Sequence, residues 1–142
     1  MTPQDLLRLH PFFAELSEQD GEALLKRTRT RRVPAGHILF QEGDAGDGLY
    51  GILAGRVAFT VDSVQGKGLI LNVLGPGEFF GEIALLDGGP RSATVTARTD
   101  MRLLGLTEWV FRGLIQEHPT IAVRTLESMA GRLRAATQAA TA

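Results

Sequence analysis

The chain has 142 residues, of which 44% are hydrophobic and 22% charged, and its formal net charge at neutral pH is −1. This size and apolar content predict one compact domain with its own core, and the near-zero charge excludes an overall basic field for non-specific binding to nucleic acid. Cysteine is absent, which excludes disulfides, thiolate catalysis and cysteine-ligated iron–sulfur clusters.

No apolar run approaches the roughly 20 residues that a membrane-spanning helix needs. The N-terminus also lacks the charged start and apolar core of a signal peptide. We therefore expect a cytoplasmic protein without a membrane segment, which is either a whole small protein or the N-terminal part of a longer one.

Helices are expected over residues 2–27. Thr2 precedes a proline and caps a first short helix over residues 3–10, since proline is favoured at the first helical position. Ser17 caps a second helix over residues 18–26, with Asp20 near the positive end of its dipole.

A dense basic stretch follows, formed by Lys26, Arg27, Arg29, Arg31 and Arg32. Threonines alternate with these cations just before a predicted strand. This alternation favours a solvated strand face over a nucleic-acid patch.

Residues 29–106 have the pattern of short antiparallel strands. Glycines recur between residues 36 and 81, at a density that suits tight strand turns. Apolar residues recur with period two between them, as in Val57, Phe59 and Val61. About eight such strands predict a mainly β protein with flanking helices, folded as an antiparallel β-roll or jelly-roll barrel.

Two helices are expected over residues 107–136. Thr107 caps the first, which should end before His118 and Pro119. The last helix, starting near Thr120, carries one apolar stripe, which is the usual face for covering a barrel; its members are Ile121, Leu126, Met129 and Leu133.

Residues 80–95 hold the chain's most informative pattern. Gly81 opens one helical turn whose first N–H groups have no partner within the helix and suit an anion. Arg91 adds a forked, permanently charged donor for the same anion. Glu82 is an acceptor that suits a sugar hydroxyl, and Ser92 is small and can donate one hydrogen bond. This combination predicts a site for a small, singly charged sugar phosphate.

The alternative is that Glu82 and Arg91 form a structural salt bridge with each other. The preceding glycine, Pro90 and the small residues that follow Arg91 all fit the sugar-phosphate hypothesis as well, so we favour that hypothesis.

This run resembles the phosphate-binding cassette of the cyclic nucleotide-binding domain. Residues 33–44 resemble that family's early strand pair, residues 50–57 its central hairpin and residues 75–79 the turn before the cassette. The likeness spans about residues 9–134. It implies a single domain over 1–142, with N-terminal helices, a β-roll that contains the cassette, and two C-terminal helices.

The resemblance also implies residue roles. Arg91 binds the cyclic phosphate and Glu82 the ribose hydroxyl. Backbone groups and small side chains complete this end of the site, contributed by Gly81, Ile83, Ala84, Ser92 and Ala93.

The expected base end of the site is less complete. Phe59, Leu71 and Val73 wall the base, and Arg132 falls where some bacterial channel domains have a purine-capping arginine. The family's adenine-contacting Thr and Ser positions are occupied by Ala136 and Thr137, which is an incomplete match.

Ser92 favours cAMP over cGMP, because cGMP-binding relatives often have Thr there; a cyclic dinucleotide is less favoured. The histidines are scattered without metal-ligand spacing, and no catalytic triad can be recognised. We therefore expect no catalytic residue, no metal and no cofactor.

The resemblance implies a sensor that moves its C-terminal helices on binding and catalyses no reaction. One hypothesis is a stand-alone module or the ligand domain of a channel or kinase-like partner. The alternative is the sensor half of a DNA-binding regulator of the catabolite activator family. In that family the last helix pairs into a homodimer, and nucleic acid becomes a partner only if a DNA-binding domain follows Ala142.

Overall fold

The computed structural model describes residues 1–62 and 68–141. Within them the helices are α1 Pro3–Leu9, α2 Glu18–Leu25, α3 Glu82–Asp87, α4 Glu108–Glu117 and α5 Pro119–Thr141. The strands are β1 Arg29–Val33, β2 Ile38–Phe40, β3 Gly48–Ala54, β4 Val57–Asp62, β5 Gly68–Leu74, β6 Phe79–Phe80, β7 Thr94–Ala97 and β8 Met101–Thr107.

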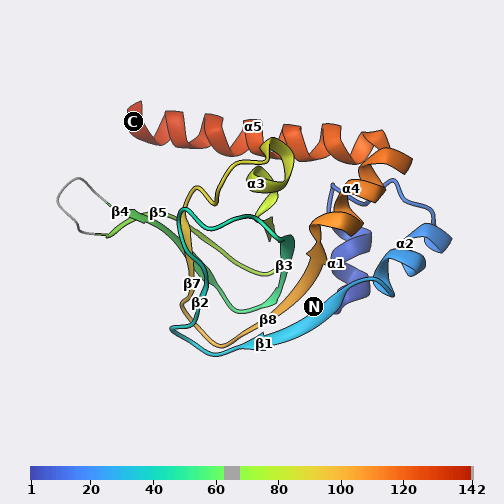
Figure 1. Ribbon diagram of the computed structural model, residues 1–142, viewed down its shortest axis with the longest axis horizontal. Coiled ribbons are helices and arrows are strands. Elements are labelled where there is room, and N and C mark those ends of the chain that lie inside the picture. The colour runs from blue at the N-terminus through green and yellow to red at the C-terminus, as the bar shows by residue number, and fades with distance from the viewer. Residues whose placement is uncertain (63–67, 142) are drawn as a thin grey trace.

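The strands form two four-stranded antiparallel sheets, in the orders β1-β8-β3-β6 and β2-β7-β4-β5. This arrangement confirms the predicted antiparallel β-roll with helices at both ends. Figure 1 shows α1, α2 and α4 gathered at one end of the roll and the β4–β5 hairpin extending from the other. The long helix α5 runs across the roll and passes over α3.

The predicted helix starts are confirmed. The side chains of Thr2, Ser17 and Thr107 each accept a hydrogen bond from the backbone N–H three residues later. These bonds satisfy N–H groups that have no acceptor within the helix. Both α1 and α2 end one residue earlier than expected.

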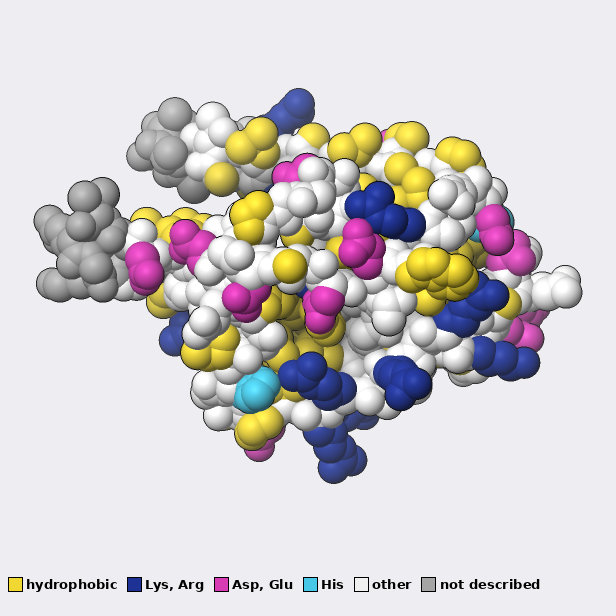
Figure 2. Space-filling model, viewed as in Figure 1, with side chains coloured by type: hydrophobic (Ala, Val, Ile, Leu, Met, Phe, Trp, Pro, Cys, Tyr) yellow, Lys and Arg dark blue, Asp and Glu magenta, His cyan; other side chains and the backbone are white. Residues whose placement is uncertain are grey.

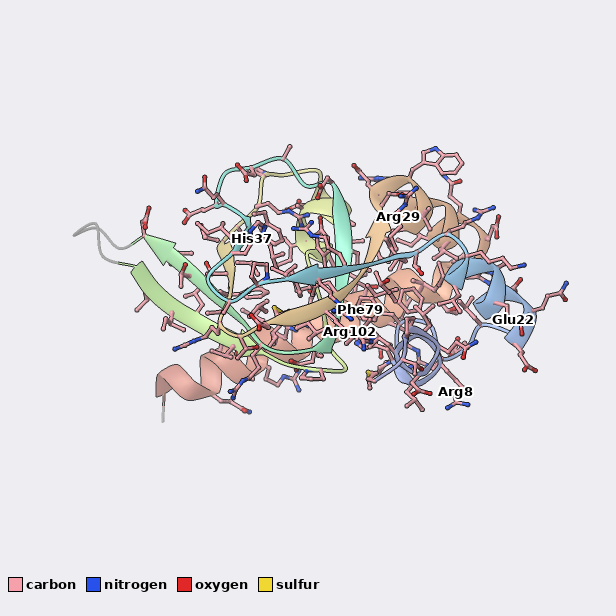
Figure 3. The ribbon with its side chains drawn as sticks, turned by 90° about the horizontal axis from the view of Figure 1, so that it is seen from below. Arg8, Glu22, Arg29, His37, Phe79 and Arg102 are labelled. Atoms are coloured by element: carbon pink, nitrogen blue, oxygen red, sulfur yellow. The ribbon has the colours of Figure 1, made fainter. Side chains whose placement is uncertain are left out.

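Two apolar cores meet at strand β6. Phe79 packs in the core between the strands and the terminal helices, with Phe12, Phe13 and Phe111. Phe80 packs in the core inside the roll, since consecutive strand residues point to opposite faces. Figure 3 shows Phe79 in the interior, whereas Arg8 and Glu22 lie at the outside of α1 and α2. The predicted cassette therefore begins where both cores hold it.

The last helix differs from its prediction in length and in its buried face. It runs to Thr141, past the expected end at residue 136, because its final turns are rich in alanine, the strongest helix former. Ile121 is buried as expected, but Leu126 and Leu133 are more than half exposed. The expectation that the whole apolar stripe covers the barrel is therefore wrong, because Leu126 and Leu133 face solvent. Polar Thr125 is fully buried instead, because its hydroxyl donates to the carbonyl of Ile121 at 2.8 Å.

Candidate functional site

The turn into α3 requires glycine at residue 81. Gly81 has a φ of 96°, in the left-handed region, and precedes the first turn of α3. A Cβ added there would lie 2.8 Å from Nη1 of Arg91 and 3.0 Å from the carbonyl oxygen of Gly48. The glycine thus allows the guanidinium and the backbone to approach each other closely.

Arg91 is a buried cation in which one guanidinium nitrogen, Nε, lacks a hydrogen-bond partner in the described chain. Its side chain lies over the ring of Phe40, at 4.0 Å from the centroid, and the residue is 3% exposed. Nη1 donates to the carbonyl of Gly81 at 2.8 Å, and Nη2 donates to the carbonyl of Gly48 and to Oδ1 of Asp47. Nε has no hydrogen-bond partner among the described residues. A buried, unpaired N–H of this kind is costly unless a ligand or water accepts from it.

Glu82 is also buried, and it pairs with the last helix rather than with Arg91. Its Oε1 accepts from Nη1 of Arg132 at 2.9 Å, and Nη2 of Arg132 donates to the carbonyl of Phe79 at 2.7 Å. The alternative of a Glu82–Arg91 salt bridge is therefore wrong, because each side chain pairs elsewhere. Arg132 therefore connects α5 to Glu82 of the cassette and to Phe79, which directly precedes it.

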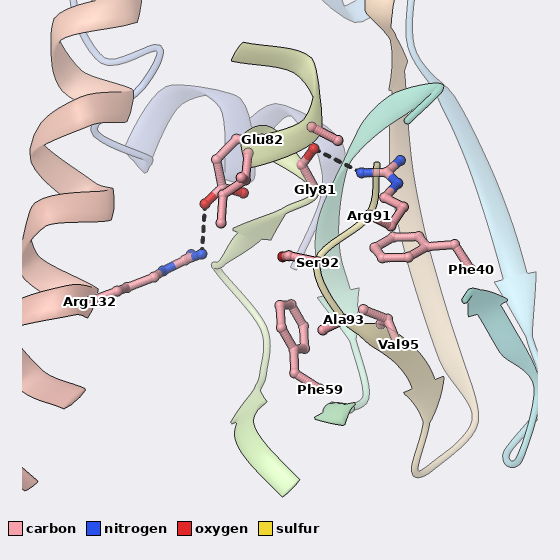
Figure 4. A pocket seen from close by; sticks show the side chains of 11 residues that line it. Phe40, Phe59, Gly81, Glu82, Arg91, Ser92, Ala93, Val95 and Arg132 are labelled. Atoms are coloured by element: carbon pink, nitrogen blue, oxygen red, sulfur yellow. Dashed lines mark hydrogen bonds and ion pairs between the residues drawn. The ribbon is translucent and has the colours of Figure 1, made fainter. Parts of the chain in front are cut away.

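These side chains line one pocket with about 350 Å³ of space, partly open to solvent (Figure 4). The lining residues are Phe40, Phe59, Gly81, Glu82, Ile83, Ala84, Arg91, Ser92, Ala93, Val95 and Arg132. Every predicted contact except Leu71 and Val73 is among them, and their roles in binding stay predictions.

Leu71 and Val73 are not brought into the pocket. Their side chains on β5 are 55% and 40% exposed, and neither lines the cavity. The ladder between β4 and β5 shifts register after Phe59, and Phe59 is paired with Asn72. Directly opposed residues of an antiparallel pair share a face, so Asn72 shares the face of Phe59. Ala136 and Thr137 are exposed on α5 and also lie outside the lining.

Sequence reasoning missed Phe40, Asp47 and Val95. Val95 is buried and stands at the end of the small-residue run that follows Arg91. The alternation of apolar residues along this run could have indicated that Val95 faces the pocket. Phe40 and Asp47 contact Arg91 from positions more than forty residues earlier in the chain, so no local pattern pointed to them.

His10 lies beside this site in the terminal-helix core. Its ring packs against Phe12 and Phe79, and Nδ1 accepts from the backbone N–H of Phe12 at 3.2 Å. Burial, with a further contribution from the positive charge of Arg132, lowers the pKa of His10 to about 4. The imidazole is therefore neutral in the folded protein at pH 7.

This pKa predicts a pH-dependent stability. Between about pH 6.5 and 4 the unfolded chain binds the His10 proton and the folded chain does not, so stability falls as the pH decreases through this window. We expect a loss of about 2 kcal/mol in the free energy of unfolding, after discounting for partial exposure. Urea unfolding across this range checks it. His10→Gln, which keeps a neutral acceptor, should lack this component, and an identical pH profile in both proteins would contradict the assignment.

Within the described ranges, no helix is both long and apolar enough to cross a membrane. In the same part of the chain, no group of three or more histidine or acidic side chains is arranged to hold a metal ion.

Comparison with known proteins gives consistent matches. The family model "Cyclic nucleotide-binding domain" matches residues 30–118. A CRP-like cAMP-activated global transcriptional regulator of Mycobacterium tuberculosis is 35% identical over 112 residues, which are 79% of this chain and 50% of that protein. A cyclic nucleotide-gated potassium channel of Rhizobium etli is 38% identical over 112 residues, 79% of this chain and 30% of the channel.

Among solved structures, the catabolite activator protein of Thermus thermophilus aligns with a TM-score of 0.81 and 35% identity, over 92% of this chain and 62% of that one. This chain thus spans about half the length of the mycobacterial regulator. The matched family binds ligands, which confirms the expectation that this domain catalyses no reaction. The fold, the cassette and these matches together show that the chain belongs to the cyclic nucleotide-binding domain family.

Proposed function

We propose that this pocket binds a cyclic nucleotide, with cAMP preferred over cGMP, and that binding shifts the position of α5. The observation that carries the proposal is the buried guanidinium of Arg91, a residue that lines the pocket and whose Nε has no hydrogen-bond acceptor among the described residues. A cyclic phosphate carries one negative charge and oxygens that accept such a bond. The phosphate of a ligand would thus supply the hydrogen-bond acceptor that the protein's own groups do not give to Arg91 among the described residues.

The phosphate end is completed by neighbouring groups. Ser92 is exposed at the pocket and offers a hydroxyl. Gly81 has no side chain to cap α3, so the first N–H groups of that turn have no side-chain acceptor within the described chain. Together with Arg91 these donors surround the place where the phosphate would lie.

Glu82 is the proposed ribose contact. A carboxylate accepts several hydrogen bonds, so Glu82 can hold Arg132 and a ribose 2′-hydroxyl at the same time. Its burial keeps such a charge-assisted bond strong.

The ribose contact predicts a specific loss with 2′-deoxy-cAMP. The folded wild-type chain should bind this analogue about ten- to a hundredfold more weakly than cAMP, the scale of one hydrogen bond to a charged group. Glu82→Ala should bind both nucleotides almost equally. Asp87→Ala removes an exposed carboxylate from the same helix and should keep the wild-type preference. Equal binding of the two nucleotides by the wild type would contradict the ribose role.

The base end supports only a modest preference. Phe59 and Val95 offer apolar surface to any purine, and the choice of cAMP depends on Ser92 and on the mycobacterial relative, which is described as cAMP-activated. A difference of one hydrogen bond is worth about 1 kcal/mol, or roughly fivefold in affinity. A cyclic dinucleotide remains the less favoured ligand.

The contact between Arg132 and Glu82 is the proposed route to α5. Arg132 of α5 donates to Glu82 at 2.9 Å, so a ligand that also bonds to Glu82 would change the free energy of this contact. A ligand shifts a conformational equilibrium by its difference in affinity for the two states. Binding would therefore change the population of α5 positions.

The second candidate is the sensor half of a transcriptional regulator, working as a homodimer through α5. Val123, Leu126 and Leu133 are spaced along one face of α5 and are all more than half exposed. A second α5 would cover this face. In this candidate, nucleic acid would be bound by a further domain and not by this one; the mycobacterial relative, of which this chain covers half, is described as a transcriptional regulator. The similarity to the Rhizobium channel supports the other hypothesis, in which the domain regulates an ion channel.

The homodimer proposal predicts the effect of charge on that face. Leu126→Glu/Leu133→Glu should convert a dimer to a monomer and leave the melting temperature of the isolated fold nearly unchanged, because both side chains are exposed in the monomer. Sedimentation equilibrium measures the mass. A wild-type chain that stays monomeric at high micromolar concentration would contradict the dimer.

Thermal unfolding tests the sensor proposal. A ligand that binds only the folded state stabilises it by about 2.7 kcal/mol when its concentration is a hundred times the Kd. We therefore expect millimolar cAMP to raise the melting temperature by several degrees, and 5′-AMP at equal concentration to raise it much less. Equal effects of the two nucleotides would contradict recognition of the cyclic phosphate.

A further inference from the structure

The strongest unexplained feature outside the pocket is a row of uncompensated cations on and before β1. Its members are Lys26, Arg27, Arg29, Arg31 and Arg32, which we call the basic strip. All five side chains are exposed. Among the described residues, none of the strip arginines forms an ion pair with an acidic side chain. The arginines that do form ion pairs are residues 8, 91, 112, 124 and 132. Arg31 has one polar side-chain neighbour, Nε2 of His37 at 3.3 Å.

The basic strip follows an open sheet edge. β1 pairs with β8 on one side and is the first strand of its sheet, so its other side leaves alternate N–H and C=O groups without a strand partner in the described chain. Figure 2 shows Lys and Arg side chains spread over the lower part of the molecule, where β1 runs in Figure 1. Figure 3 places Arg29 and His37 toward opposite ends of β1.

The local pairing concentrates charge further. Arg32 lies directly opposite Arg102 of β8, and like charges at opposed positions destabilise an antiparallel pair. Arg29 and Arg31 share the other face of β1, about 7 Å apart along the strand. The chain as a whole has a net charge of −1, so this positive field is local to one edge.

We propose that the basic strip binds an acidic segment of a partner protein, which adds to β1 as an extended strand. Backbone groups of the open edge would pair with the segment, as in β-strand addition. Acidic side chains at alternate positions of that segment repeat every 7 Å or so, which matches the spacing of Arg29 and Arg31. Charge complementarity would fix the partner's register and speed association.

Two other occupants fit less well. A second copy of this chain would bring a second basic strip to the same edge, and the charges would repel. A nucleic acid would need a broader basic field than one row of cations on a chain of net charge −1. None of the strip residues lines the pocket, so this inference does not depend on the proposed ligand.

The test uses the whole chain and a defined probe. An eight-residue capped peptide of alternating Glu and Thr is titrated into the isotope-labelled protein, and the shifts of backbone amide signals are followed by NMR. We expect saturable shifts at β1 and its neighbours, with affinity that falls as salt rises. The matched peptide with Lys in place of Glu should cause none of these shifts.

Two double variants with the same change in net charge distinguish an effect of the basic strip from an effect of the overall charge. Arg29→Glu/Arg31→Glu should weaken peptide binding at least tenfold. Arg56→Glu/Arg134→Glu changes exposed cations elsewhere and should weaken it less than twofold. Thermal melts establish that both variants are folded, since exposed strand charges contribute little to stability. No saturable shifts at β1, an equal loss in both variants, or tighter binding of a single-stranded oligonucleotide at the same residues would each overturn the proposal.

Discussion

Replacing Arg91 by leucine is expected to weaken cAMP binding about ten- to a hundredfold, or by roughly 1.5 to 3 kcal/mol. Leucine fills part of the same space but removes the charge and all the guanidinium donors, including Nε, the one without a partner in the described chain. Binding is measured by calorimetric titration. Arg91→Lys keeps the charge without the fork and should lose less affinity than Arg91→Leu.

The matched control is Arg98→Leu. Arg98 is exposed and lies outside the pocket, so this change should leave the affinity within about twofold of wild type. Arg91 also donates to the carbonyls of Gly48 and Gly81. Its replacement removes this donor from both carbonyl oxygens, which lowers the stability of the fold. Affinities are therefore compared only at temperatures where far-ultraviolet circular dichroism reports a folded protein. An unchanged affinity in folded Arg91→Leu would mean that Arg91 is purely structural.

Replacing Phe79 by alanine is expected to lower the free energy of unfolding by about 3 to 5 kcal/mol. Phe79 is fully buried, with ring contacts to His10, Phe12 and Phe13. The truncation leaves a cavity between the strands and the N-terminal helices, directly before the cassette. Urea denaturation measures the change.

Trp109→Ala is the control for this stability effect. Trp109 has a larger aromatic side chain than Phe79, but it is 79% exposed on α4. Its removal should change the free energy of unfolding by less than about 0.5 kcal/mol. Comparable losses at Phe79 and Trp109 would contradict the packing described for the two positions.

Local signals explain what could be predicted from the sequence. The helix starts at Thr2, Ser17 and Thr107 follow from capping by the side-chain oxygen, which acts within three residues. The period-two pattern within residues 29–106 predicts short antiparallel strands, and the strands form two antiparallel sheets. The cassette was recognisable because its glycine, carboxylate and arginine lie within a short stretch.

Contacts between segments that are distant in the chain explain what could not be predicted from the sequence. Leu71 and Val73 follow the strand pattern, but a register shift opposite Phe59 changes which residues of β5 share its face. On α5, the helical period allowed an apolar stripe through Leu126, yet the helix turns Ile121 and Thr125 inward and brings Arg132 to Glu82. The choice among the faces of a helix depends on what lies opposite it, and that partner is fifty residues away in the chain.

The central claim is that the pocket around Arg91 recognises a cyclic nucleotide. The most direct measurement is calorimetric titration of the whole chain with cAMP and with cGMP, at two temperatures so that a binding enthalpy near zero at one of them is not mistaken for absence of binding. We expect saturable binding of one nucleotide per chain, tighter for cAMP than for cGMP. No heat with either nucleotide at both temperatures would contradict the claim.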